Sequence, residues 1–369
     1  MKKYFLYFFL ILSLVSCHHD KDSEDSTSTT TTSSSGTTYS YTCIVVNQGN
    51  YSESNGSISL YNSATGAVTQ EVFTTANGYK LGSIIESATL HADLILLMCN
   101  NEDKVVLLNS STMKAVSDPI TGIGIPRYAA IHGNYAYVSC WQKKNSSGTV
   151  TVAQHVAKID LSTKKVVGSL QTTGQPEGML IKGDTLYVAS GSGMDVYNAN
   201  TDALIKHIDS QFTTADAQQL VVDKNGCVWL SLGTYSTSSA GGFMCVDPSS
   251  LTIKTQFAES KLTYEGDMAV SPAKDKIYFL YSNGIVSGQT ADVATSIYSL
   301  DVSSYQVSSS PVVTGVGFYG LGVEPSTGTI YTANVNGFIT NSMMYLYDTS
   351  GNKLTSLMTG VGTCRFVFK

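Results

Sequence analysis

The chain has 369 residues, a formal net charge of −6 and only 14% charged residues, whereas glycine (32) and tyrosine (22) are abundant. An acidic chain is not drawn to nucleic acid or to anionic lipid by its overall charge, and no run of 18 or more apolar residues is present to span a membrane as a helix. The composition is typical of a β-rich protein that works outside the cytoplasm.

The first residues predict a secretion signal. Lys2 and Lys3 form a positive region, residues 4–15 are apolar, and Leu14 to Cys17 resembles a bacterial lipobox. This interpretation predicts that residues 1–16 are a lipoprotein signal peptide, removed on export, and that the Cys17 thiol is lipidated. An ordinary signal peptide with an incidental cysteine is the alternative.

A flexible tether is predicted next, over residues 17–39. Every residue from Ser26 to Thr38 is Ser or Thr except Gly36, so nothing apolar can be buried to offset the ordering entropy. The acidic run from Asp20 to Asp25 resembles the surface-export signal of outer-membrane lipoproteins. We therefore expect a lipid-anchored protein on the outer membrane that faces the cell exterior, with the periplasmic leaflet as the alternative.

From residue 40 onward one short pattern recurs. Its clearest copy runs from Val156 to Val167: a strand, an acidic residue that opens a turn, a Ser or Thr three places on, and a second strand. An Asp or Asn at the turn accepts hydrogen bonds from backbone N–H groups two and three residues ahead, which closes a tight hairpin. The seven turn residues are Asn62, Asn109, Asp160, Asn198, Asp247, Asp301 and Asp348.

The spacing of these hairpins predicts the fold. The intervals are 38 to 54 residues, which is typical of propeller blades of four strands each. The first unit lacks its first strand, whereas residues 363–368 form an isolated strand pattern at the end of the chain. We predict an all-β, seven-bladed β-propeller over residues 40–369, in which the C-terminal strand closes the N-terminal blade.

In propellers, the loops between the fourth strand and the next first strand, and between the second and third strands, surround the channel on one face. Here these loops are rich in amide, Tyr and Trp side chains, which suits a neutral, hydrogen-bonding ligand with apolar parts. Trp141 stands at the mouth of an inserted loop and could contact a ligand or pack under that loop. The candidate ligand-binding residues are Asn47, Gln48, Asn100, Arg127, Trp141, Glu177, Tyr235, Glu265, Tyr319 and Arg365.

Catalytic motifs are weak. The sequence has no G-x-S-x-G, H-E-x-x-H or phosphate-binding G-x-x-x-x-G-K-[ST] motif. Glu177, Glu265 and Asp267 would approach the channel and could bind a cation or act as acid and base, but the same residues are ordinary turn chemistry. Arg127 and Arg365 could pair with them. We expect no enzyme activity, no catalytic residue, no cofactor and no metal.

Six cysteines follow Cys17, and no C-x-x-C motif occurs among them. Cysteines within strands commonly behave as small buried apolar residues. Cys43 with Cys364 at the ring closure, and Cys227 with Cys245 within one blade, are two pairings that the sequence leaves open.

The laid-out blades resemble the YncE-like, surface-layer-type seven-bladed propellers found as surface lipoproteins, including the BtuG-like members that capture cobalamin. The resemblance covers Ile44 to the C-terminus and rests on Val46–Asn50, Pro126–Tyr128, Tyr135–Val138, Gly174–Met179 and Leu186–Ala189. It implies a nutrient-binding protein that takes a small molecule, first a corrinoid such as cobalamin, and passes it to a TonB-dependent outer-membrane transporter. A propeller that binds glycan or protein in an uptake or adhesion complex is the main alternative, and a lactonase-type enzyme a weaker one.

Overall fold

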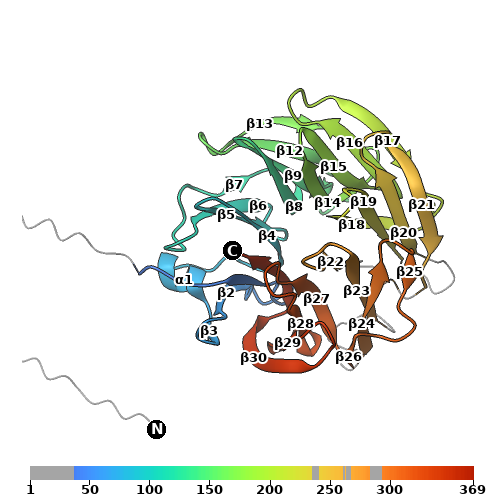
Figure 1. Ribbon diagram of the computed structural model, residues 1–369. Helices are drawn as coiled ribbons and strands as arrows, with labels where there is room; N and C mark the ends of the chain where they lie inside the picture. The colour runs from blue at the N-terminus through green and yellow to red at the C-terminus, as the bar shows by residue number, and fades with distance from the viewer. Residues whose placement is uncertain (1–36, 235–240, 261, 263–266, 283–292) are drawn as a thin grey trace, which may run out of the picture. The chain divides into compact units, whose positions relative to one another are not determined.

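The repeated hairpins pair into seven antiparallel sheets arranged around a common centre (Figure 1). A computed structural model describes them over residues 37–234, 241–260, 262, 267–282 and 293–369, within the unit from Thr37 to Lys369. Each sheet is one blade. The predicted all-β, seven-bladed β-propeller is therefore confirmed.

In six blades the strands follow chain order from the centre outward, and in the first blade β31 lies inside β1, β2 and β3. The innermost strands, in ring order, are β31 (Thr363–Phe368), β4 (Ile85–His91), β8 (Ile125–His132), β14 (Pro176–Lys182), β18 (Asp216–Val222), β22 (Met268–Val270) and β27 (Phe318–Val323). The second strands are β1 (Cys43–Asn47), β5 (Leu94–Cys99), β9 (Tyr135–Trp141), β15 (Thr185–Ser190), β19 (Val228–Gly233), β23 (Lys276–Ser282) and β28 (Ile330–Asn334).

The two remaining positions carry the hairpins. The third strands are β2 (Ser57–Asn62), β6 (Lys104–Asn109), β12 (His155–Asp160), β16 (Gly193–Asn198), β20 (Gly242–Asp247), β24 (Ala294–Asp301) and β29 (Asn341–Tyr347). The outer strands are β3 (Ala67–Thr69), β7 (Ile120–Thr121), β13 (Lys165–Leu170), β17 (Leu204–Asp209), β21 (Thr252–Ala258), β25 (Gln306–Val307) with β26 (Val313–Val316), and β30 (Lys353–Val361).

Three short elements were not predicted. Helix α1 (Val72–Asn77) lies between the first two blades and buries Val72 and Phe73. A 3-10 turn, η1 (Asn336–Phe338), joins β28 to β29, and the hairpin β10 (Lys143–Lys144) and β11 (Val150–Val152) occupies the insertion after Trp141. In the part of the chain that the structure describes, no helix has the length and apolar character needed to cross a bilayer.

The ring closes as the sequence predicts. Strand β31 pairs antiparallel with β1, so that Cys43 lies opposite Phe368 and Asn47 opposite Thr363 (Figure 1). The amide of Asn47 is buried, accepts a hydrogen bond from Thr363 Oγ1 at 2.8 Å and donates one to Ser59 Oγ at 3.0 Å. The first blade is therefore fastened by backbone pairing and by this side chain.

The turn residues of the hairpins behave alike. Asn109 Oδ1 accepts hydrogen bonds from the backbone N–H of Ser111 at 3.1 Å and of Thr112 at 2.9 Å. The other six carboxylates or amides accept from the residue two places ahead and from one three or four places ahead. The turn chemistry predicted from the pattern is confirmed at six positions, whereas at Asp348 the second bond comes from Asn352, four places ahead.

The core fills the spaces between blades. In β5, for example, Ile95 and Leu97 join the cluster shared with the first blade, while Leu96 and Met98 join the cluster shared with the third. Because successive side chains of a strand point to opposite faces of the sheet, one apolar strand packs against both neighbouring blades. Trp229 is fully buried in such a cluster, as expected from its place within a strand.

Candidate functional site

Two families of loops form one face of the ring, which we call the loop face. The loops that lead into the innermost strands bond directly to those between second and third strands: Ala217 N donates to Gly191 O at 2.7 Å, and Gln48 N to Gly362 O at 2.8 Å. These bonds confirm that the two loop families share a face.

The innermost strands begin with an irregularity at this face. The pairing between first and second strand shifts by one residue in six blades, between Ile85/Ser87, Pro126/Ala129, Pro176/Met179, Ala217/Leu220, Tyr319/Leu321 and Thr363/Arg365. Such bulges re-aim side chains and are common next to functional sites. The residues within the shifts are Glu86, Arg127, Tyr128, Glu177, Gly178, Gln218, Gln219, Gly320 and Cys364.

Charged members of this set form a chain of ion pairs around the channel. Arg127 Nη1 pairs with Glu86 Oε2, and Arg127 Nε pairs with Glu177 Oε2 at 3.0 Å. All three residues are nearly inaccessible to solvent, with exposed fractions of 7%, 7% and 2% for Arg127, Glu86 and Glu177. Because Glu86, Arg127 and Glu177 start β4, β8 and β14, one guanidinium joins three neighbouring blades.

A second arginine continues the network across the channel. Arg365 of β31 donates to both carboxylate oxygens of Asp267 at 2.6 Å, and its Nη2 donates to the hydroxyl of Tyr128. The Tyr128 hydroxyl in turn donates to Glu86 Oε1 at 3.2 Å. Asp267 precedes β22 and Tyr128 lies in β8, so these bonds span the centre of the ring. Together they define the channel cluster: Glu86, Arg127, Tyr128, Glu177, Asp267 and Arg365.

Burial sets the electrostatics of the channel cluster. Desolvation raises the pKa of Asp267 although the neighbouring Arg365 acts in the opposite direction. Desolvation likewise raises the pKa of the Tyr128 hydroxyl well above its usual value. For Arg365, burial opposes the charge, but Asp267 and Tyr128 outweigh it, so its pKa lies well above the usual range. The arginine therefore stays charged while the tyrosine stays neutral.

The channel also contains buried donors that no acceptor satisfies within the described residues. They are Nε2 of Gln218, Nε2 of Gln219, Nε of Arg365 and Nε1 of Trp141. The Arg127 guanidinium lies 4.0 Å from the centre of the Trp141 ring, which places this indole against the cluster. A buried polar group without a partner is costly, and these four N–H groups have no acceptor among the described residues.

The rim of the loop face is strained and partly apolar. Phe338 has φ 63° and Ile84 has φ 56°, a left-handed conformation that bulky and β-branched residues rarely adopt. The Phe338 ring contacts that of Tyr319 edge-on, 5.1 Å between centroids. Nearby, Asn50 Nδ2 donates to Phe338 O at 2.9 Å. Next to these residues in the chain, Tyr51 and Ile339 are 73% and 63% exposed.

The predicted site residues divide into four groups. Arg127, Glu177 and Arg365 belong to the channel cluster, and Trp141 contacts it. Tyr319 lies at the rim. Asn47 is buried in the ring closure, whereas Gln48 O and Asn100 N bond to the backbone of Ile85 and Ile84. Tyr235, Glu265 and Cys17 lie outside the described residues.

Sequence reasoning missed four members of the site: Glu86, Tyr128, Gln218 and Gln219. A signal was present, since each is the second, third or fourth residue of an innermost strand, at or next to the position that Arg127 and Glu177 occupy in their own blades. Aligning the seven strand starts with one another, instead of weighing each loop alone, would have found them. The paired arginines confirm the expectation that Arg127 and Arg365 meet channel carboxylates.

The fold and the channel cluster define a seven-bladed propeller with a charged, donor-rich channel mouth. The chain belongs to the family described as "Domain of unknown function (DUF5074)", whose model matches residues 41–360. The comparison with curated proteins finds no significant match.

Several solved structures have a similar fold at low sequence identity. A periplasmic gluconolactonase of Pseudomonas aeruginosa superposes with a TM-score of 0.63 at 14% identity, covering 89% of this chain and 99% of that one. A quinonprotein alcohol dehydrogenase-like protein of Bacteroides thetaiotaomicron has a TM-score of 0.61 at 13% identity, with coverage of 90% and 79%. A putative 6-phosphogluconolactonase of Bacteroides fragilis has a TM-score of 0.60 at 12% identity, with coverage of 91% and 99%. At such identities the likeness establishes the propeller fold alone.

Proposed function

We propose that this protein captures a small molecule on its loop face, above the channel cluster. The observation that carries the proposal is the set of four buried N–H donors, from Gln218, Gln219, Arg365 and Trp141, for which the described part of the chain offers no acceptor. A ligand that presents carbonyl, amide or hydroxyl oxygens would complete these bonds. The carboxylates and guanidinium groups beneath are already paired, so the site favours a neutral ligand over an ion.

A corrinoid such as cobalamin is the first candidate. Its macrocycle carries amide side chains, whose carbonyl oxygens could accept hydrogen bonds from the four N–H donors. Its broad apolar faces suit the exposed apolar side chains at the rim, such as Tyr51 and Ile339. The strained backbone at Phe338 and Ile84 also supports a binding role, because strain of this kind clusters at ligand sites. The resemblance to corrinoid-capturing propellers agrees with this choice.

Anchoring and delivery complete the proposal. Lipidation at Cys17 would tether the propeller to the outer membrane, and a TonB-dependent transporter would receive the ligand. Metabolic labelling with a tagged fatty acid should mark the wild-type chain and leave Cys17→Ala unlabelled. Equal labelling of the two proteins would contradict the anchor.

Calorimetric titration of the purified chain with cyanocobalamin and with cobinamide tests the ligand. We expect one-to-one binding that Trp141→Phe weakens by about tenfold, since that variant keeps the ring but removes one N–H donor worth about 0.5–1.5 kcal/mol. Gln218→Leu should act alike. Val167→Ala, an exposed change on the outer strand β13, should bind as the wild type does. No heat with either compound would reject a corrinoid and direct the search to glycans.

A lactone hydrolase is the second candidate, favoured by the similar structures described as gluconolactonases. A sugar lactone also offers acceptor oxygens to the orphan donors, and the buried Asp267 could exchange a proton because its pKa is raised. Hydrolysis of glucono-lactone above the uncatalysed rate, lost in Asp267→Asn, would support this candidate. A rate equal to that of buffer would remove it.

A further inference from the structure

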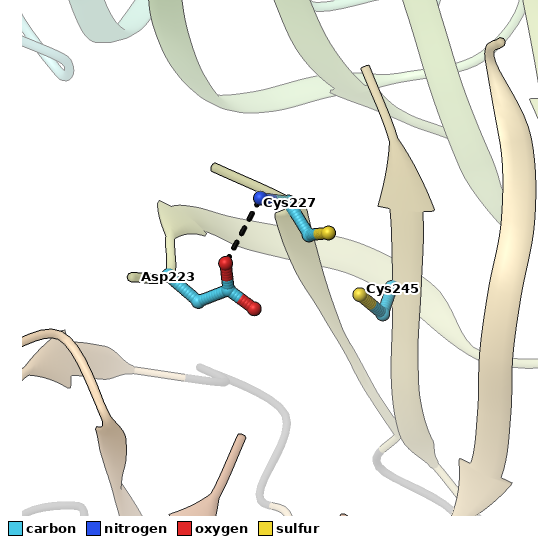
Figure 2. Close-up of side chains that lie close together, drawn as sticks. All are labelled: Asp223, Cys227 and Cys245. Atoms are coloured by element: carbon cyan, nitrogen blue, oxygen red, sulfur yellow. Dashed lines mark hydrogen bonds between the residues drawn. The ribbon is translucent and has the colours of Figure 1, made fainter. Parts of the chain in front are cut away.

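A second cluster of reactive side chains lies in the fifth blade, at the end of the blade away from the loop face. Asp223 follows β18, Cys227 precedes β19, and Cys245 lies in β20. One ligand atom from each residue lies within 4.8 Å of the others, and all three residues are buried. Figure 2 shows the two sulfur atoms turned toward one another with the carboxylate beside them.

The strand register explains why the two cysteines meet. Trp229 lies opposite Cys245 in the β19–β20 pair, and Cys227 is two residues before Trp229, so its side chain shares that face. The two thiols are therefore diagonal neighbours on one face of the sheet. Both are recorded as free thiols, buried to 4% and 1% exposure for Cys227 and Cys245.

The carboxylate of Asp223 is fixed in place by three donors. Its Oδ1 accepts from the backbone N–H of Asn225 at 2.8 Å and of Cys227 at 2.9 Å, and its Oδ2 accepts from Trp229 Nε1 at 2.9 Å. Metal-ligating carboxylates are typically oriented by such outer bonds. Oδ2 accepts one of these bonds and Oδ1 two, so Oδ2 retains a lone pair for a further partner.

Distances within the cluster suit a thiophilic divalent cation. Three atoms that lie no more than 4.8 Å apart can all lie within about 2.8 Å of a common point, and zinc needs about 2.0–2.3 Å to such ligands. Closing the difference takes small side-chain rotations. Two thiolates and one carboxylate are also the soft and oxygen donors that zinc accepts together.

Charge is balanced by a fourth residue. Lys254 Nζ, from β21, lies 3.4 Å from Cys227 Sγ, and a neighbouring ammonium favours the thiolate form that binds metal. Two thiolates and a carboxylate carry three negative charges, which Lys254 and a divalent cation would neutralise. Such neutralisation is what a buried ionic site requires.

A groove lies between the fifth and sixth blades. This groove of about 470 Å³ is lined by Thr255 and Phe257 of β21 and by Tyr305 beside β25. Thr255 lies opposite Cys245 in the sheet, and the Tyr305 ring packs on Trp229 at 5.8 Å between centroids. The groove thus borders the residues that surround the two thiols.

From this geometry we infer that Asp223, Cys227 and Cys245 form a binding site for one thiophilic divalent cation such as Zn²⁺, reached from the groove between the fifth and sixth blades. The site lies apart from the channel cluster and does not depend on the function proposed for it. The cation would link the Asp223 turn to the third strand of the blade. Its role is to bind the two thiols and hold the turn in place.

Titration of the purified chain with Cd²⁺ under reducing, oxygen-free conditions tests the inference directly. We expect one equivalent of Cd²⁺ to produce the ultraviolet thiolate-to-cadmium band, and one equivalent of Zn²⁺ to displace it. Cys227→Ser and Cys245→Ser should each weaken Cd²⁺ binding by more than about tenfold, because even outer-shell changes cost about 10–100-fold. Asp223→Asn should weaken binding while keeping the band.

Cys140→Ser is the matched control, since Cys140 is a buried strand thiol that donates to Val138 O and has no place in the cluster. It should bind Cd²⁺ as the wild type does. A readout on the wild type alone guards against variants that fail to fold: Cd²⁺ should protect Cys227 and Cys245, and no other thiol, from alkylation mapped by mass spectrometry. A missing band, equal protection of all thiols, or a Cys227–Cys245 disulfide whose reduction yields no Cd²⁺ binding would overturn the inference.

Discussion

The two ends of the propeller use the same acidic side chain in opposite ways. At the hairpin turns, Asp160 and Asp301 are exposed, and hydrogen bonds from the turn backbone lower the pKa of each. In the channel, Asp267 is buried against Arg365, and desolvation raises its pKa. The turn carboxylates accept backbone hydrogen bonds from two and three residues ahead, whereas Asp267 depends on a partner 98 residues away.

This difference separates what repeats from what does not. The turn residues recur at every blade, and each accepts backbone hydrogen bonds from its own hairpin, so they specify the fold locally. The channel residues lie at, or one place beyond, the same position of the innermost strands, yet their chemistry changes from blade to blade: Glu86, Arg127, Glu177, Gln218 and Arg365. This departure from the repeat distinguishes the channel from the hairpin turns.

Removing the closing strand should have the largest effect. Deleting residues 364–369 strips the first blade of its innermost strand and leaves β1 with an unpaired edge. We expect loss of cooperative unfolding and a soluble yield near zero, measured by denaturant titration and size-exclusion chromatography. Deleting Lys369 alone leaves β31 paired and should preserve the transition. A folded, cooperative 364–369 deletion would contradict the closure.

Breaking the channel network should come next. Arg127→Met leaves Glu86 and Glu177 buried without their shared cation, which should cost about 3–5 kcal/mol of unfolding free energy. The control is Lys143→Met, which removes an ion pair with Asp103 whose lysine is 43% exposed, and should cost about 0–1 kcal/mol. Both unfolding free energies are measured by urea denaturation. Similar decreases for Arg127→Met and Lys143→Met would show that burial does not make one ion pair more important for stability than the other.

A single hairpin turn should matter less. Asn109→Ala removes the acceptor for Ser111 N, Thr112 N and Thr112 Oγ1 and should lower the unfolding free energy by about 1 kcal/mol. Asn109→Asp keeps an acceptor oxygen and should be close to neutral. The same urea measurement distinguishes them, and equal losses would indicate that the turn bonds are not what stabilises the hairpin.

The smallest effect is a contrast in pH dependence. An unfolded aspartate titrates near 3.9. Because the pKa of folded Asp267 is raised, its contribution to stability is lost as the pH rises from about 3.9 through the folded value. The wild type should therefore lose stability relative to Asp267→Asn across that window. Asp267→Asn also loses the ion pair with Arg365. This loss lowers the unfolding free energy of the variant at every pH in the window, and it does not change how that free energy depends on pH.

Asp301→Asn should show the opposite slope. The pKa of Asp301 is lowered by bonds from Ser304, so its contribution is present above about 3.9 and is lost as the pH falls through the folded value. The unfolding free energy of the wild type should thus increase relative to that of Asp301→Asn as the pH rises. Unfolding free energies measured from pH 3 to pH 7 provide the test. If the difference from the wild type changed with pH in the same direction for Asp267→Asn and Asp301→Asn, the two carboxylates would not be shifted in opposite directions.

Local chemistry explains how much of the fold was predictable. The Asx turns and the alternation of apolar residues act within one blade, so the strands, the blade number and the closing strand followed from spacing. Helix α1 and the 3-10 turn were missed because neither is long enough to leave a periodic pattern. Asn47 was chosen as a ligand contact because it stands where a strand meets a loop of the loop face. A polar residue at a strand end can instead point into the core, as this amide does.

The channel cluster was only half predictable for a different reason. Arg127, Glu177 and Arg365 were found because charge is scarce in this chain, so a charged residue at a strand start was conspicuous. The partners that were missed depend on contacts between blades, such as Arg365 with Tyr128 and Arg127 with Glu86, which no local spacing encodes. The burial of these side chains, and with it the direction of each pKa shift, is set only when the first residues of the seven innermost strands come together around the channel.

The pairing of β1 with β31 also dictates when the molecule can finish folding. The partners Asn47 and Thr363 are separated by 316 residues, and bringing such distant segments together costs about 5 kcal/mol in chain entropy from the length term alone. During synthesis the first blade must therefore wait, with one strand edge open, until the last residues of the chain have emerged. The other six blades can form in sequence while the first remains incomplete, so the first blade to be synthesised becomes the last to be sealed.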